Sequence, residues 1–166
     1  MTAPDISAAQ QLLTRAGASI DRLLSGSDAD RLAAMIDVDA DAVERRYEDG
    51  VVALQDARYG EAADAFAEAA VARPDIARYH FALGLCFQQL DHVNEALEQF
   101  ATALALDATD AAAAFRLGEC FMAGNRFDDA REALRMSVQL CALPENDPCI
   151  RPLAEALLDR LAAEGA

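Results

Sequence analysis

Side chains that could do chemistry are few in this sequence, and their spacing matches no common reactive site. The two histidines, His80 and His92, are twelve residues apart, whereas two metal ligands on one helix face stand about three or four residues apart. Neighbouring carboxylates such as Asp128 and Asp129 belong to an acidic chain, where solvated charge is their usual role. The sequence also lacks a glycine-rich phosphate loop and a GxSxG motif. We therefore predict no metal, no cofactor and no enzymatic activity.

The cysteines have a structural explanation as well. None of the four forms a CxxC pair, the spacing that zinc and redox sites commonly use. Cys86 and Cys120 are 34 residues apart, and we interpret them as small buried residues at equivalent places in a repeat. Free thiols of this kind suit a reducing cytoplasm.

Composition limits the partners and the compartment. The chain has 166 residues, of which 54% are apolar, so it fits one domain with a sizeable core. Its 29 acidic and 14 basic residues give a net charge of -15, which disfavours nucleic acid and anionic membrane surfaces as partners. The N-terminus lacks an export signal, and no segment has the roughly 18 apolar residues of a membrane span. We expect a soluble cytoplasmic protein without direct membrane insertion.

A period of 34 residues runs through the middle of the chain. The units are 43–76, 77–110 and 111–144, and six columns of similar residues stay in register across them. The columns are Tyr47, Phe81 and Phe115; Gly50, Gly84 and Gly118; Tyr59, Val93 and Phe127; Ala62, Ala96 and Ala130; Phe66, Phe100 and Leu134; and Ala69, Ala103 and Ser137. This pattern predicts paired antiparallel helices, with a helix A and a helix B in each unit.

Two features of each unit explain how its helices would pack. A glycine on helix A is followed 16 positions later by a large apolar residue on helix B, as in Gly84 and Phe100. The glycine allows a close approach of the two helices, and the large side chain fills the remaining gap. Asp41, Asp75 and Asp110 precede the A helices, and we expect them to cap these helices.

The repeat resembles the tetratricopeptide repeat, and unit 77–110 matches the family pattern most fully. The matching residues of that unit are Phe81, Leu83, Gly84, Phe87, Ala96, Phe100 and Ala103. The proline that ends the family's repeat is present only as Pro74, with Ala108 and Ala142 at the later equivalents. The resemblance implies an all-α tetratricopeptide repeat solenoid of three helical hairpins.

Helical segments are expected on both sides of the repeats, at residues 1–42 and 145–166. The first carries an apolar stripe that either packs on the first repeat or on a short helix around 29–36, or pairs with a second copy of the chain. The stripe comprises Ile6, Ala9, Leu13, Ala16, Ile20 and Leu23. The second segment is predicted to form a capping helix. Its apolar residues are Leu153, Leu157, Leu158 and Leu161.

The A helices of such a solenoid line its concave side, so helical spacing selects the residues that face a ligand. They are Tyr47, Val51, Leu54, Phe81, Leu85, Gln88, Phe115, Glu119 and Met122. This mostly apolar lining suits an extended peptide that inserts hydrophobic side chains. The alternative for any single position is intramolecular core. Because the chain contains no lysine, a clamp for an acidic C-terminus is disfavoured.

A narrower resemblance rests on residues 15–20, 79–86 and 115–120. These stretches, the chain length and the three repeats look like the class II chaperones of type III secretion systems, over roughly residues 6 to 140. The resemblance implies a bacterial cytoplasmic chaperone. It would hold the N-terminal segments of hydrophobic translocator proteins in its groove, keeping them soluble and apart before export.

The resemblance also implies roles for individual residues. The N-terminal helix would form a homodimer, and the groove residues would contact the hydrophobic anchors of the translocator. The dimer residues would be Leu13, Ala16, Ile20 and Leu23, and the anchor-binding residues Tyr47, Val51, Leu54, Phe81 and Phe115. Family members often carry aromatic residues where this chain has Val51 and Leu54. A general tetratricopeptide adaptor in another protein assembly is the alternative function.

Overall fold

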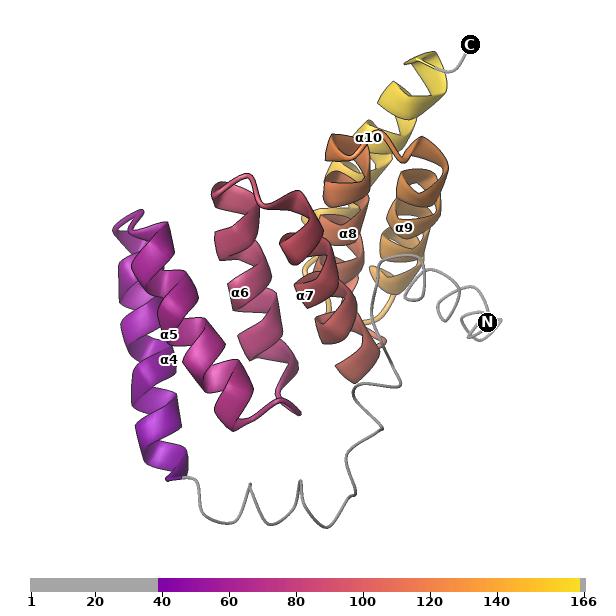
Figure 1. Ribbon diagram of the computed structural model, residues 1–166. Coiled ribbons are helices and arrows are strands. Elements are labelled where there is room, and N and C mark those ends of the chain that lie inside the picture. Colours follow the sequence, from indigo (N-terminus) through magenta and orange to yellow (C-terminus); the bar gives the residue numbers. More distant parts are fainter. Residues whose placement is uncertain (1–38, 165–166) are drawn as a thin grey trace, which may run out of the picture.

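The computed structural model describes residues 39–164, and every regular element in this range is an α-helix (Figure 1). The helices are α4 (Ala40–Gln55), α5 (Tyr59–Ala72), α6 (Ala77–Gln89), α7 (Val93–Leu106), α8 (Ala111–Ala123), α9 (Phe127–Leu140) and α10 (Ile150–Glu164). The predicted all-α class is therefore confirmed. The proposed dimer residues and the short helix around 29–36 lie outside the described residues.

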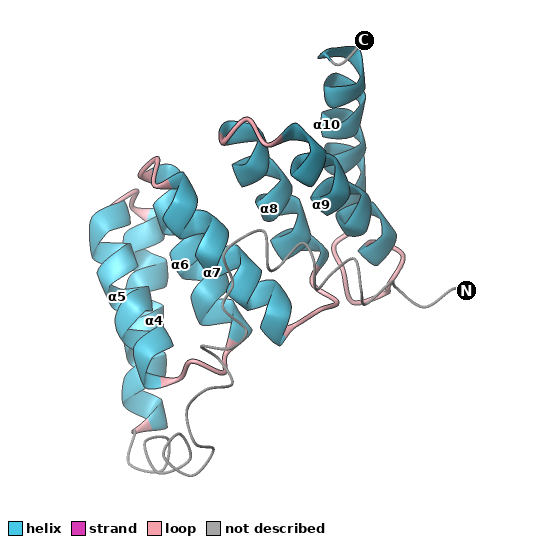
Figure 2. Ribbon diagram, turned by 45° about the vertical axis from the view of Figure 1, so that its right-hand side comes forward, coloured by secondary structure: helices cyan, strands magenta, loops and turns pink. Residues whose placement is uncertain are grey.

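Successive helices pair into hairpins, α4 with α5, α6 with α7, and α8 with α9. The three hairpins lie side by side in chain order, and α10 packs on α9 and α8 (Figures 1 and 2). Helices α6 and α8 begin at Ala77 and Ala111, the first residues of the second and third repeat units. Helix α4 begins at Ala40, ahead of the expected start at Val43.

The predicted close approach of glycine and a large residue is present in all three hairpins. A Cβ atom added to Gly50 would lie 2.6 Å from the ring of Phe66. A Cβ atom added to Gly118 would likewise lie 2.7 Å from the side chain of Leu134. Because real Cβ contacts are longer than 3.0 Å, these positions accommodate only glycine while the partner side chain keeps its place.

The capping predictions were right for one aspartate and wrong for two. The side chain of Asp110 accepts hydrogen bonds from the backbone N–H groups of Ala112 and Ala113. Helix α4 is capped by Asp39 instead of Asp41, because the helix begins earlier than expected. Helix α6 has no side-chain cap at all, and Asp75 accepts hydrogen bonds from Arg73.

The turns inside the three hairpins share a left-handed residue, which the amino-acid types at that position do not indicate. Ala57, Asp91 and Asn125 each have a positive φ, of 58°, 61° and 57°. They are equivalent positions of the 34-residue repeat. The left-handed conformation is needed to reverse the chain between helix A and helix B, although none of the three residues is glycine.

One histidine and two cysteines that could have done chemistry are part of the packing. The ring of His80 lies between the carbonyl oxygen of Pro74, 3.1 Å from Nε2, and Oε1 of Gln99, 2.9 Å from Nδ1. It therefore joins α6 to α7, in agreement with an interhelical role. Cys86 and Cys120 are buried at equivalent positions, as their column predicted. Burial raises the pKa of the Cys86 thiol to about 11 and that of the Cys120 thiol to about 12.

Helix α10 covers the end of the last hairpin with a face slightly different from the expected one. Ala154 and Leu161 are buried, and Leu157 and Leu158 are half-buried against the core. Leu153 was wrongly placed on this face, since 54% of it is exposed. No helix among residues 39–164 is long and apolar enough to cross a membrane.

Candidate peptide-binding site

Helices α4, α6 and α8 are connected to one another by their side chains. The rings of Tyr47 on α4 and Tyr79 on α6 have centroids 5.1 Å apart. Gln88 on α6 donates a hydrogen bond of 3.2 Å to Glu119 on α8. The A helices are thus neighbours in one layer, and we call the face that carries the nine predicted ligand-facing residues the A-helix wall.

Most of the nine predicted residues take an intermediate position between core and surface. Eight of them are half-buried, and Phe115 is buried with 8% of its surface exposed. The half-buried residues are Tyr47, Val51, Leu54, Phe81, Leu85, Gln88, Glu119 and Met122. Their apolar members pack on the hydrophobic core of the hairpins. The wall consequently offers apolar surface that the chain itself covers only in part.

The α4–α6 part of the wall is aromatic and is covered by a charged group. Tyr47 packs against Phe66, with ring centroids 5.3 Å apart, in addition to its contact with Tyr79. The guanidinium carbon of Arg78 lies 5.1 Å from the centroid of the Tyr47 ring, a distance suited to a cation–π contact. Burial raises the pKa of the Tyr47 phenol. Tyr47 is therefore shared between the core and a surface already occupied by Arg78.

Arg78 is held in place by Glu44, and our sequence reasoning missed both residues. The Glu44 carboxylate accepts hydrogen bonds from Arg78 and from the Tyr79 hydroxyl, the latter at 3.1 Å. Glu44 and Arg78 are 34 residues apart and so occupy the same column of adjacent repeats. Opposite charges in one column were the signal that could have predicted this link between A helices.

The middle of the wall is apolar. The ring of Phe81 makes an edge contact with Phe100 of the same hairpin, with centroids 5.5 Å apart. Leu85 and Met122 lie half-buried against the core cluster of the second and third hairpins. Among residues 39–164, no cation–π contact places an arginine over Phe81. Phe81, Leu85 and Met122 therefore provide surface for hydrophobic contact.

The α6–α8 part of the wall contains a polar link where we had expected separate ligand contacts. Oε2 of Glu119 accepts hydrogen bonds from Nε2 of Gln88, at 3.2 Å, and from Nη1 of Arg116, at 2.8 Å. Oε1 of Gln88 is buried and has no hydrogen-bond partner among residues 39–164. An unpaired buried acceptor costs about 1–3 kcal/mol. Arg116, which the sequence reasoning also missed, holds the carboxylate that orients the amide.

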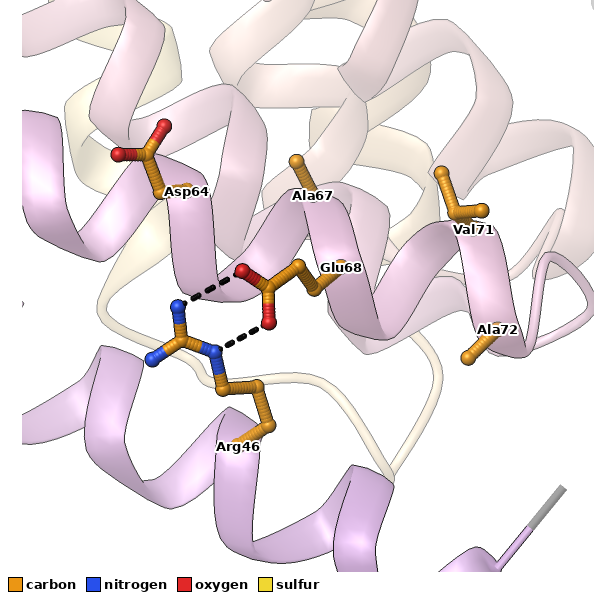
Figure 3. A pocket seen from close by; sticks show the side chains of 6 residues that line it. All are labelled: Arg46, Asp64, Ala67, Glu68, Val71 and Ala72. Carbon is orange, nitrogen blue, oxygen red and sulfur yellow. Dashed lines mark hydrogen bonds and ion pairs between the residues drawn. The ribbon is translucent and has the colours of Figure 1, made fainter.

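A separate pocket of about 560 Å³ lies between α4 and α5 and contains none of the nine predicted residues (Figure 3). Arg46 spans it by donating two hydrogen bonds to Glu68, at 2.6 and 2.9 Å. The remaining lining consists of Asp64, Ala67, Val71 and Ala72. Within residues 39–164, no group of three or more His, Cys, Asp or Glu side chains could hold a metal ion.

Comparison with known protein families agrees with this architecture. Tetratricopeptide repeat models match residues 47–91 and 89–140. Together the two matches span 47–140, which is more than half of the 166-residue chain. The chain is a tetratricopeptide repeat protein. A comparison with curated protein sequences finds no significant match.

Solved structures similar to this tetratricopeptide repeat protein include two secretion chaperones. Pseudomonas aeruginosa PcrH, in complex with the chaperone-binding region of PopD, matches with a TM-score of 0.75 and 23% identity, over 78% of this chain and 98% of that chain. The Yersinia enterocolitica type III secretion translocator chaperone SycD matches with a TM-score of 0.74 and 18% identity, over 84% of this chain and 97% of the SycD chain. The expected match in fold to translocator chaperones is thus confirmed over most of the chain.

A tetratricopeptide repeat domain from a different setting has the same fold. The first such domain of Spaghetti (RPAP3), bound to the HSP90 peptide SRMEEVD, matches with a TM-score of 0.67 and 20% identity, over 76% of this chain and 95% of that chain. Fold similarity therefore extends across tetratricopeptide repeat proteins with unrelated ligands. The ligand class has to be argued from the side chains of the A-helix wall.

Proposed function

We propose that this tetratricopeptide repeat protein is a type III secretion chaperone. It binds the N-terminal segments of hydrophobic translocator proteins along the A-helix wall and keeps them soluble and apart before export. The observation that carries this proposal is the fold match to PcrH and SycD over nearly the whole of those chains, 98% and 97%. SycD has also been crystallised with a peptide of the translocator YopD.

The physical character of the wall supports a hydrophobic ligand. Val51, Leu54, Leu85 and Met122 are half-buried, so a bound segment can cover the remainder of their apolar surface. Burial of each large apolar anchor on the ligand contributes about 1.5–3 kcal/mol before the costs of ordering the segment. The mechanism requires no ATP, because occupancy of the wall alone lowers the free concentration of an aggregation-prone chain.

The alternative is a general tetratricopeptide adaptor, and the match to the RPAP3 domain bound to an HSP90 peptide supports it at the level of the fold. That peptide, SRMEEVD, is acidic at its C-terminal end. The present chain has no lysine and a net charge of -15, which opposes an acidic ligand. We therefore favour the hydrophobic translocator segment.

The proposal includes a bacterial cytoplasmic location and a homodimer formed through Leu13, Ala16, Ile20 and Leu23. A structure described as an alternative dimer of SycD matches this chain with a TM-score of 0.74, which supports self-association as a property to test. Ile20→Asp would place a carboxylate in the apolar stripe. Light scattering should then show a dimer for the unaltered chain and a monomer for the variant, and an unchanged mass would contradict this part of the proposal.

Co-expression tests the chaperone role. A translocator encoded beside this chain should be insoluble when expressed alone and should co-purify with the chain when both are expressed. The double variants Val51→Asn/Leu85→Asn and Tyr47→Ala/Phe81→Ala should each reduce co-purification. The thermal unfolding of the second variant must also be measured, because Tyr47 contacts Phe66 and Phe81 contacts Phe100, so that their loss can weaken the core.

A matched control comes from the outer surface of α5. Val71 is 83% exposed and lies outside the A-helix wall, so Val71→Asn should leave co-purification unchanged. The proposal fails if the translocator remains insoluble in the presence of the chain. It also fails if both folded double variants retain the translocator as well as the unaltered chain does.

A further inference from the structure

The contact between α4 and α6 differs from that between α6 and α8 at one column of the repeat. Glu44 on α4, Arg78 on α6 and Ala112 on α8 are equivalent positions, 34 residues apart. Glu44 and Arg78 form an ion pair, so charged side chains meet where α4 adjoins α6. Where α6 adjoins α8, the residue equivalent to Arg78 is the half-buried Ala112, which offers no such partner.

The guanidinium of Arg78 covers the aromatic surface of the first of these contacts. Its carbon lies 5.1 Å from the centroid of the Tyr47 ring and 5.2 Å from that of Tyr79, within the range of cation–π contacts. Glu44 holds the guanidinium there and also accepts a hydrogen bond of 3.1 Å from the Tyr79 hydroxyl. The Arg78 side chain is nevertheless 54% exposed, so this cover lies at the surface of the A-helix wall.

The equivalent aromatic ring on α6 lacks a cover of this kind. Phe81 is the column partner of Tyr47 and is also half-buried. None of the cation–π contacts within residues 39–164 involves Phe81. Arg116 does lie 5.8 Å from the centroid of Phe115, but only 8% of Phe115 is exposed. A ligand therefore meets an open apolar ring on α6 and a charged group at the equivalent place on α4.

We propose that Arg78, held by Glu44, determines where a bound segment can place a large apolar side chain. Phe81 accepts such a side chain, and Tyr47 rejects it. This inference rests on the proposed function. A large side chain on the Tyr47 ring would either displace the guanidinium from both tyrosines or bury the ion pair under apolar atoms, and each alternative costs free energy. A small residue at that place leaves the pair in water.

The test uses a synthetic, fluorescein-labelled peptide covering the N-terminal segment of the translocator that co-purifies with this chain. In a set of derivatives, phenylalanine replaces one residue at a time. Fluorescence anisotropy gives the dissociation constant of every peptide for the unaltered chain, for Arg78→Ala and for the control Arg45→Ala. Arg45 is an exposed residue of α4 that pairs with Asp39, so its loss changes the net charge equally.

One position of the peptide should reveal the cover. Phenylalanine there should weaken binding to the unaltered chain and to Arg45→Ala about tenfold, whereas Arg78→Ala should bind the same derivative as tightly as the original peptide. The two changes are then coupled by about tenfold. Glu44→Gln should shift the affinities in the same direction but less, because it removes the charge that holds Arg78 and keeps the side-chain shape. Thermal unfolding establishes that each variant is folded.

Other results would overturn the inference. If Arg78→Ala weakens the original peptide and every derivative alike, Arg78 contacts the ligand and does not exclude part of it. If the unaltered chain and Arg78→Ala respond equally to phenylalanine at every position, the cover selects nothing. If no translocator co-purifies, the proposed function fails and the inference fails with it. That outcome is seen before any peptide is made, so the two failures are distinguishable.

Discussion

The side-chain oxygen of Asn146 accepts a hydrogen bond of 2.9 Å from the backbone N–H of Ala111, the first residue of α8. The amide nitrogen of Asn146 donates to the carbonyl oxygens of Thr109 and Leu140, at 2.8 and 3.1 Å. One side chain therefore joins the start of α8, the turn before it and the end of α9. It fastens the loop that leads to α10 onto the last repeat.

Asn146→Ala should lower the free energy of unfolding by about 1–3 kcal/mol, because three hydrogen bonds are lost, among them the one to the backbone N–H of Ala111 at the start of α8. Urea unfolding followed by circular dichroism measures the change. Asn94→Ala, at an exposed position of α7, provides the matched control and should be neutral within about 0.5 kcal/mol. Equal stabilities for the two variants would contradict the role assigned to Asn146.

Gly84→Ala should destabilise the protein by about 1–3 kcal/mol, because the added Cβ would lie 2.7 Å from the ring of the fully buried Phe100. Gly60→Ala is the matched control, since a Cβ at Gly60 meets no atom within 4 Å and the residue lies in α5. It should be neutral or stabilising by about 0.5–1 kcal/mol. Thermal unfolding of both variants decides the matter, and a neutral Gly84→Ala would mean that Phe100 can move aside.

Ala57→Gly should stabilise the chain by about 1 kcal/mol, because Ala57 has a φ of 58° that costs an L-residue free energy. The same change at Asn125, with a φ of 57°, should help less, since asparagine tolerates this conformation better than alanine does. Ala156→Gly in the interior of α10 is the control for the general cost of glycine and should be destabilising. A loss of stability in Ala57→Gly would contradict the assigned strain.

The buried thiols predict a decline in stability at high pH. Burial raises the pKa of Cys86 to about 11 and that of Cys120 to about 12, from an ordinary value of 9.0. The unfolded chain therefore loses these protons first, so the thiols' contribution to stability is complete below about pH 9 and is lost as the pH rises through the folded-state pKa values.

Urea unfolding of a Cys86→Ala/Cys120→Ala variant tests this linkage between pH 8 and 11. The variant should be less stable at pH 8 because of the lost core volume, but its stability should fall less steeply with rising pH than that of the unaltered chain. Cys149→Ser, at an exposed position where only Asp147 and little burial raise the pKa of the thiol, should change the slope less than the double variant does. An identical slope in the double variant would assign the decline to other groups.

Sequence reasoning was most successful where a physical requirement recurs every 34 residues. The pairing of Gly50 with Phe66, and of Gly118 with Leu134, appears in the structure as predicted because each hairpin needs the same close approach. It failed where the requirement is local to one element. Asp75 stands at a typical capping position, yet the side chain pairs with Arg73 instead and α6 begins without a side-chain cap.

Residues of the A-helix wall could be selected from helical spacing, but their partners could not. Spacing places Gln88 and Glu119 on the same face of successive A helices, and it suggested two separate ligand contacts. Their mutual hydrogen bond depends on the offset between α6 and α8, which the packing of whole hairpins sets. The same reason explains why Arg78 was missed, since its place over Tyr47 depends on how α4 and α6 lie together.

The amino-acid sequence by itself determined that the chain folds as repeated helical hairpins, because apolar periodicity and the glycine columns allow few other ways to bury its large side chains. Only the tertiary structure decided how much of each wall residue remains exposed and which polar groups are already paired. Those properties depend on distances between helices far apart in the chain. They leave Leu85 half-buried, Phe115 nearly covered and the side-chain oxygen of Gln88 without a donor in the part of the chain that the structure describes.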